Sequence, residues 1–403
     1  MKKLLILAAA TLVLGACKDN FDIEDLDERS KLVVNCFPSE ADTTWIEVTR
    51  SVPISKGAAA SHYNDMMEVR DAHIIYKVNG KECNIGWKDR VVDQWGFVQK
   101  GGRYFVVEPQ HEGDRVELRV EAEGYAPVDA ETVVSRLVPI SLESISEVRV
   151  YDDYYEESRN VYQLAATFSD PGETTDYYTV RIRCKHFRGM AIGDLRPDCP
   201  DREQWADEAH VEWPLRSEME YEQVKENGWD EIYDFQLQVD STYTNPNILT
   251  MSEPLLRPLG SLDSDFGFES EWYQEFYVFD DTAINGQTYT LHLNLSTWHD
   301  NNIMYCFRPI QYQVLLFHLS PAFYRYVKSI NDIDNNELAQ SGLSMLSPTY
   351  SNVRGGIGIV GGYCMSQSNW KTMNQPESGG IYYEGEQSSF YRVNHLLKSY
   401  QSL

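Results

Sequence analysis

Cys17 is the residue whose surroundings point most directly to chemistry. Leu14-Gly15-Ala16-Cys17 has the form of a bacterial lipobox, in which small residues before the cysteine let a lipoprotein signal peptidase reach the backbone. The Cys17 thiol would take a diacylglycerol, and the cysteine would become the new N-terminus. Acyl chains contribute about 0.8 kcal/mol per buried CH₂, so two or more of them, such as palmitate, anchor a protein stably. The sequence therefore predicts lipidation of Cys17. The alternative is an ordinary signal peptide with a chance cysteine.

The segment before Cys17 has the length of a signal peptide. Lys2 and Lys3 form a short basic region, and an apolar run from Leu4 to Leu14 follows. Crossing a bilayer core takes roughly 20 apolar residues, so this run is too short to span. Residues 1–16 are therefore predicted to be a lipoprotein signal peptide that is removed.

Residues 17–29 are acidic, polar and poor in core-forming side chains. Such a composition is typical of a solvated tether. The stretch also resembles the short acidic export signal that follows the lipidated cysteine in surface lipoproteins of Bacteroidota. We therefore expect anchoring in the outer membrane with the chain facing the cell exterior. The periplasmic face is the alternative.

Six cysteines remain when Cys17 is set aside, an even number that suits disulfides in an exported protein. Cys184 and Cys199 are nearest in sequence and flank a polar loop, so they are the predicted pair. Free buried thiols are the alternative. The sequence contains no C-x-x-C pair, which argues against a zinc ribbon or a thioredoxin-like site.

Three other motifs match known signatures only in part. Gly356–Gly361 spells G-x-G-x-x-G, but a dinucleotide site needs a following helix. A strand with close backbone approach is the better interpretation. Asp263–Glu269 lacks the glycine and glutamate positions of an EF-hand loop, although a looser cation site stays open. His299 and Asp300 are adjacent and would face opposite sides of a strand. We expect no catalytic residues, no cofactor and no metal.

Aromatic residues in polar segments are the candidate binding residues. Tyr154 and Tyr155 lie in an acidic, tyrosine-rich stretch, and Trp205 and Trp213 lie in a charged segment. Tyr and Trp supply a large contact area at low entropic cost and are enriched at interfaces. We expect these four to contact a ligand or partner. The alternative is that the tyrosine rings cover the end of a sandwich.

The formal net charge of -27 limits the possible partners. Such a field repels the phosphates of nucleic acids, so a nucleic-acid partner is excluded. It also repels anionic head groups, so we expect only the lipid on Cys17 to touch the membrane. An apolar content of 42% supports real hydrophobic cores.

The strand pattern divides the chain beyond the tether into two parts. Residues 30–138 contain short β-prone segments, the strict alternation of Arg115–Ala122 and the hairpin signal Asn79-Gly80. They are predicted to form an immunoglobulin-like or transthyretin-like β-sandwich. Residues 139–403 are predicted to form a larger β-rich, sandwich-type domain, so the fold class is mainly β.

Two features interrupt the strands of this larger part. Residues 185–235 are charged and weakly periodic, which indicates an insertion with a short helix. Ser320-Pro321 looks like a helix cap followed by proline at the first helical position. Because apolar residues then recur at helical spacing, we expect one amphipathic helix over 321–333.

Five separate segments of the mature chain together carry a family resemblance: Asp170-Pro171-Gly172 with Tyr177-Tyr178, Phe279-Asp280-Asp281, Asn285–Tyr289, Tyr324–Ser329 and Asn352–Tyr363. They resemble the Bacteroidota surface-lipoprotein family catalogued as domain of unknown function forty-two forty-nine. The glycine-rich last segment is the most specific. The family has no established activity, so the resemblance transfers no catalytic residue. Its members are often encoded beside TonB-dependent receptors, which implies a receptor as partner.

The expected function is therefore that of a non-enzymatic outer-membrane surface lipoprotein, an accessory or ligand-capture partner of a TonB-dependent receptor. A structural or adhesive surface protein is the first alternative. A surface hydrolase is the second, because paired carboxylates can come from distant strands that the sequence does not identify.

Overall fold

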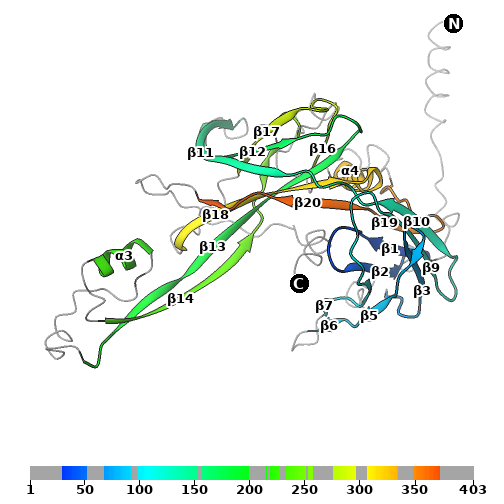
Figure 1. Ribbon diagram of the computed structural model, residues 1–403, viewed down its shortest axis with the longest axis horizontal. Helices are drawn as coiled ribbons and strands as arrows, with labels where there is room; N and C mark the ends of the chain where they lie inside the picture. The colour runs from blue at the N-terminus through cyan, green and yellow to red at the C-terminus, as the bar shows by residue number, and fades with distance from the viewer. Residues whose placement is uncertain are drawn as a thin grey trace, which may run out of the picture.

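The computed structural model describes residues 30–51, 68–92, 98–152, 157–198, 215, 218–226, 233–250, 253–256, 276–295, 306–334 and 348–372. These residues are mainly β, as predicted, and form two sandwiches with a long arm that projects from the second (Figure 1).

The first sandwich consists of a sheet in the order β19-β1-β2-β8-β5 and a sheet in the order β10-β9-β3-β4. A two-stranded β6-β7 ribbon accompanies them. The strands are β1 (Leu32–Cys36), β2 (Thr44–Arg50), β3 (His73–Val78), β4 (Lys81–Glu82), β5 (Gly86–Lys88), β6 (Val91–Val92), β7 (Val98–Lys100), β8 (Arg103–Val106), β9 (Arg115–Glu121), β10 (Val128–Val133) and β19 (Ile357–Val360).

Alternation along the strands builds the core of this sandwich. In β9, Val116, Leu118 and Val120 point inward while their neighbours face solvent, because successive side chains lie on opposite faces. The predicted hairpin at Asn79-Gly80 is confirmed. Both residues have positive φ, as the tight turn between β3 and β4 requires.

The second sandwich consists of a sheet in the order β11-β12-β17-β15 and a sheet in the order β14-β13-β18-β20. In the latter sheet β16 also pairs with β13, and β21 with β18. The strands are β11 (Ile140–Asp152), β12 (Glu157–Ser169), β13 (Tyr177–Leu195), β14 (Tyr233–Thr244), β15 (Ile248–Leu249), β16 (Tyr277–Asp280), β17 (Thr288–Leu295), β18 (Cys306–Leu319), β20 (Tyr363–Gln367) and β21 (Lys371–Thr372).

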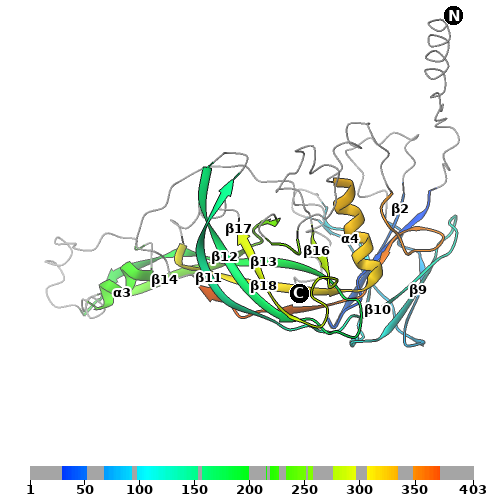
Figure 2. The ribbon, with the colours of Figure 1, turned by 90° about the horizontal axis from the view of Figure 1, so that it is seen from above.

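Strand β18 is apolar on both faces because both faces are covered. Val314 and Leu316 pack toward the sheet that contains β12, whereas Leu315 and Phe317 pack toward helix α4 (Pro321–Asp334). Figure 2 shows α4 between the second sandwich and the strands of the first. The predicted helix over 321–333 is confirmed, and the Ser320 hydroxyl accepts a hydrogen bond from the backbone N–H of Phe323.

Neither α4 nor α3 (Glu218–Glu226), the two helices in the described ranges, is long and apolar enough to cross a membrane.

A segment from near the C-terminus completes the first sandwich. Strand β19 pairs in parallel with β1, and Val353, Val360 and Cys364 contribute to the first core. The first sandwich therefore includes residues that lie far beyond the predicted range 30–138. Hairpin-like local signals do not reveal such a pairing, because more than 300 residues of chain separate Cys36 from its partner Val360.

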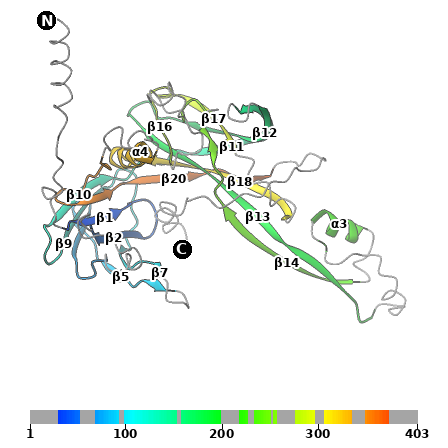
Figure 3. The same ribbon diagram turned by 180° about the vertical axis from the view of Figure 1, so that it is seen from behind.

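The predicted insertion at 185–235 begins later than expected, which corrects that boundary. Strand β13 continues to Leu195 and pairs with β14 from Tyr233 onward, so the insertion lies between these strands. Beyond Arg188, which is the last residue of β13 paired with β18, the two strands leave the sandwich as a ribbon (Figure 3). We call residues 189–195 with 233–239 the arm. The expected short helix is α3, which packs on the arm.

Candidate functional site

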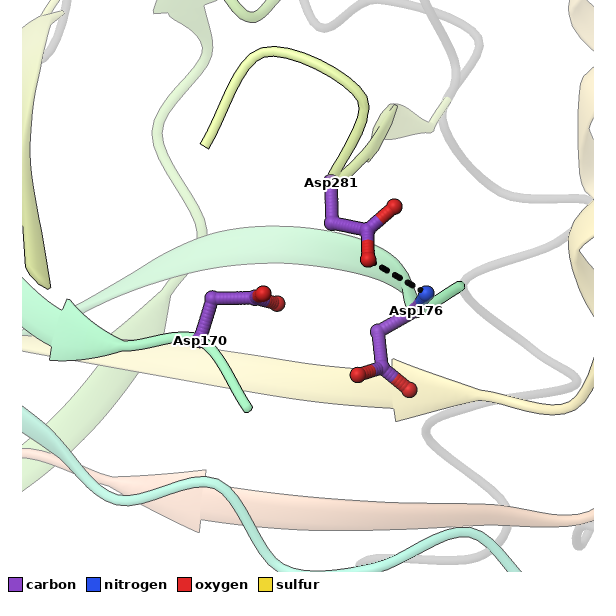
Figure 4. Close-up of side chains that lie close together, drawn as sticks. All are labelled: Asp170, Asp176 and Asp281. Atoms are coloured by element: carbon purple, nitrogen blue, oxygen red, sulfur yellow. Dashed lines mark hydrogen bonds between the residues drawn. The ribbon is translucent and has the colours of Figure 1, made fainter. Parts of the chain in front are cut away.

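Three buried aspartates meet at one end of the second sandwich (Figure 4). Asp170 directly follows β12, Asp176 directly precedes β13, and Asp281 directly follows β16. One carboxylate oxygen from each lies within 4.8 Å of the others, and among the described residues this is the one group of acids, histidines or cysteines close enough to hold a metal ion. We call it the aspartate cluster.

Asp170 is held by donors from two segments. The hydroxyl of Tyr178 donates to Oδ1 at 2.6 Å, and the backbone N–H of Gly286 donates to Oδ2 at 2.8 Å. Burial and the neighbouring Asp170 carboxylate raise the pKa of Tyr178 well above its usual range. The phenol therefore stays protonated and acts as a donor.

Asp176 joins the second sandwich to the linker that follows the first. Nη2 of Arg136 donates to Oδ2 at 2.9 Å, and Nε2 of His318 lies 3.0 Å from Oδ1. Nδ1 of His318 lies 2.9 Å from the carbonyl oxygen of Arg136.

Asp281 is the member with the weakest compensation. Its Oδ2 accepts a hydrogen bond from the backbone N–H of Asp176 at 2.9 Å, and its own N–H donates to the Asp176 carbonyl at 3.1 Å. Burial raises the pKa of Asp281, and the nearby carboxylates of Asp170, Asp176 and Asp280 raise it further. The side chain is only 1% exposed, so the negative charge is poorly hydrated.

The geometry of the aspartate cluster suits a structural role, in which hydrogen bonds hold several segments together. Both oxygens of Asp170 and both of Asp176 already accept protein hydrogen bonds. A hard cation prefers such oxygen ligands, but it would have to compete with these donors. The tyrosine beside Asp170 is held as a hydrogen-bond donor, and the hydroxyl of Thr174 donates to Asp176 at 3.0 Å. The cluster ties the linker at Arg136, two strand ends and β18 to one point.

The sequence alone does not identify these aspartates as a group. Asp170, Asp281 and Gly286 all stood in the segments that carried the family resemblance, but those segments are far apart in the chain. One signal was available, namely an acid at the end of a β-strand beside a glycine-containing turn. That pattern is common in ordinary turns, so it does not identify a cluster.

The residues predicted for binding and anchoring all fall in segments that the structure does not describe. Tyr154, Tyr155, Trp205 and Trp213 lie outside the described residues, as do Cys17, the segment 263–269 and the pair His299-Asp300. These predictions therefore stay predictions.

The cysteines fit the predicted alternative of free thiols in part. Cys36, Cys83 and Cys364 have free thiols, and burial raises the pKa of Cys364 to about 12. Cys184 is buried in the second core, but its predicted partner Cys199 lies outside the described ranges. The Cys184–Cys199 bridge is therefore untested. Thiols with such raised pKa values are poor nucleophiles.

The arm is the second candidate feature, and it suits binding. Its strands carry large exposed apolar side chains, with Leu237 42% exposed and Met190 38% exposed. Tyr243, farther along β14, is 55% exposed. Tyr221 of α3 packs edge-on against Phe235, which stiffens the ribbon. A projecting, stiffened ribbon with exposed apolar groups is typical of a surface that meets another protein.

Comparison with known proteins gives one family. A family model described as "Domain of unknown function (DUF4249)" matches residues 18–368. No curated protein and no solved structure matches the chain.

Proposed function

The chain belongs to this family of unknown function, and from that premise we propose that it is a non-enzymatic lipoprotein of the outer-membrane surface. It would serve as an accessory or ligand-capture partner of a TonB-dependent receptor. The lipobox at Leu14–Cys17 and the acidic residues 17–29 support anchoring through Cys17 with the folded part held away from the membrane.

The observation that carries the proposal is the arm. Beyond Arg188 it stands clear of both sandwiches and presents Met190 and Leu237 to solvent, where they contribute nothing to the two cores. Rigid sheets that display projecting segments suit recognition. The aspartate cluster supports the same view, since its carboxylates are committed to hydrogen bonds that hold the fold together.

Affinity purification tests the proposal. The full-length tagged lipoprotein would be recovered from gently solubilised outer membrane, and we expect a β-barrel receptor to accompany it in stoichiometric amount. The Cys17→Ser variant is the matched control, because it keeps the folded part and loses the predicted anchor. Repeated recovery of the lipoprotein alone, together with unchanged nutrient uptake in a deletion strain, would instead favour an adhesive or structural role.

A further inference from the structure

Strand β14 is the border strand of its sheet in the part of the chain that the structure describes. It is the last strand in the order β14-β13-β18-β20, and within the described ranges its strand partner is β13 alone. One side of its backbone therefore directs N–H and C=O groups away from the sheet. Its 12 residues make an edge about 40 Å long. Figures 1 and 3 show β14 and β13 extending together away from the sandwiches, with α3 beside this ribbon.

Strand β14 itself lacks three of the devices that block an exposed edge. Proteins protect such edges with proline, lysine, bulges or a covering segment. The sequence Tyr233–Thr244 contains neither proline nor lysine, and its register with β13 runs from Thr244 to Tyr233 without a bulge. The opposite border of the arm is protected, because Leu215 makes a two-hydrogen-bond bridge to Ala191 of β13.

The two faces of β14 differ in chemistry. Phe235, Leu237 and Val239 lie on one face, where α3 covers Phe235 and Val239 but leaves Leu237 exposed. Asp234 and Asp240 lie on the other face together with glutamines and threonines. A strand added at this edge would place alternate side chains beside these two rows.

Charge decides what kind of strand fits. Asp234 lies directly opposite Asp194 of β13, which places two carboxylates side by side on the polar face, and Arg196 forms an ion pair with Asp234 at 3.7 Å. A second copy of the chain would bring the same aspartates and a net charge of -27, so like charges would oppose it. A strand with lysine or arginine on its polar face would instead form opposite-charge pairs.

We propose that the outer edge of β14 is a docking site that takes an added β-strand from a different protein, apolar on one face and basic on the other. The strand's backbone would continue the hydrogen-bond ladder, and its apolar side chains would pack beside Leu237 and α3. This inference rests on the proposed function and deepens it, because it names the surface that the receptor would use and the kind of segment that would occupy it.

Peptide binding to the full mature chain, carrying Cys17→Ser for solubility, tests the site directly. The probe is a short peptide of alternating valine and lysine. Its controls are an alternating valine–glutamate peptide and a valine–lysine peptide with a central proline. We expect saturable binding of the first peptide, about tenfold weaker binding of the glutamate peptide and none of the proline peptide. Hydrogen exchange should slow at residues 233–244.

Charge variants of β14 make the test specific. Asp234→Lys with Asp240→Lys should reverse the preference between the lysine and glutamate peptides, whereas Asp234→Asn with Asp240→Asn should abolish the preference without reversing it. Unchanged melting temperatures would show that both variants fold. Absence of saturable binding, equal binding of the proline peptide, or slowed exchange outside β14 would overturn the inference.

The receptor purification separates this inference from the proposed function. If the wild-type chain recovers a receptor and the Asp234→Lys, Asp240→Lys variant recovers it equally well, the docking site is wrong and the proposed function stands. If the peptides bind β14 and no receptor is recovered, the edge of β14 does bind strands, but the proposed partnership with a receptor is wrong.

Discussion

At the residue scale, the aspartate cluster shows how buried charge can organise a fold. Asp170 and Asp176 are almost fully buried, yet every one of their oxygens has a protein donor. Buried carboxylates persist in proteins only when they are compensated in this way. Since the donors come from separate segments, each aspartate fixes the position of several strand ends at once.

Tyr178→Phe is predicted to destabilise the chain by about 1–3 kcal/mol. The change removes the hydroxyl that donates to Asp170 and leaves a buried carboxylate oxygen without that partner. Urea unfolding of the purified chain measures the loss. Tyr177→Phe is the matched control, because Tyr177 lies on the opposite face of β13 and stacks its ring on Tyr324, a contact that phenylalanine keeps. Equal losses of unfolding free energy in the two variants would contradict the structural role of the aspartate cluster.

Asp281→Asn is predicted to stabilise the chain at neutral pH. The pKa of Asp281 is raised in the folded state by burial and by neighbouring carboxylates, so the folded state binds this proton more tightly than the unfolded state does. Stability is therefore lost as the pH rises from the ordinary carboxyl pKa of about 4 through the raised value. Asparagine still accepts the hydrogen bond from Asp176 without the charge.

Thermal unfolding across pH measures this effect. The advantage of Asp281→Asn should be present above the raised pKa and should fade as the pH falls below about 4, where Asp281 becomes protonated in both states. The neighbouring Asp280→Asn, at a half-buried residue that caps its own turn, should show a smaller pH-dependent gain, because it removes only one of the charges that raise the pKa of Asp281. An Asp281→Asn variant that is less stable than the wild type at neutral pH would show that the charge is needed.

At the element scale, β19 joins a late segment of the chain to its first described strand, β1. Gly358 has a φ of +114° and lies opposite Val34 of β1, where a Cβ atom would overlap the Val34 backbone. A Cβ atom at Gly361 would come within 2.7 Å of the Phe323 side chain, and one at Gly362 would come still closer to the Val133 carbonyl oxygen. The glycine-rich motif therefore serves close backbone packing between the sandwiches and α4.

Gly358→Ala is predicted to cost about 3 kcal/mol or more, since it adds a steric overlap to an unfavourable backbone conformation. Gly124→Ala is the matched control. Gly124 also has positive φ, at +83°, but a Cβ atom there would meet open space. We expect it to cost about 1–2 kcal/mol. Chemical unfolding of both variants gives the comparison, and a Gly358 variant no worse than the Gly124 variant would refute the close approach.

At the scale of the whole molecule, the predicted anchor and the arm define the working arrangement. The lipid on Cys17 would hold the chain at a membrane, while the predicted acidic tether and the net charge of -27 would keep the folded part in water. Figure 1 shows the arm pointing away from the first sandwich, which directly follows the tether. The arm is thus free to meet a partner beside the sandwiches.

Cys17→Ser is predicted to abolish membrane retention, because serine cannot form the thioether to diacylglycerol and the run Leu4–Leu14 is too short to span a bilayer. Fractionation of cells labelled with palmitate measures both consequences. Cys83→Ser, which changes a partly exposed free thiol, is the control and should stay in the membrane fraction. A Cys17→Ser chain that still sediments with membranes and takes up palmitate would contradict the anchor.

The sequence by itself determined the local features of this protein. Alternation in β9, the Asn79-Gly80 hairpin and the Ser320-Pro321 start of α4 are encoded by neighbouring residues, so they were predicted and confirmed. The mainly β class followed from the same short-range patterns. The family resemblance was also confirmed, because its motifs are read directly along the chain.

Only the tertiary structure decided which distant segments meet. The pairing of β1 with β19 and the meeting of Asp170, Asp176 and Asp281 depend on chain closure over long separations, and nothing in the local pattern marks them. The extension of β13 into the arm was missed for a related reason. The residues of the arm alternate weakly, and the cover over Phe235 and Val239 of its strand β14 comes from α3, a separate element that only the folded chain brings into place.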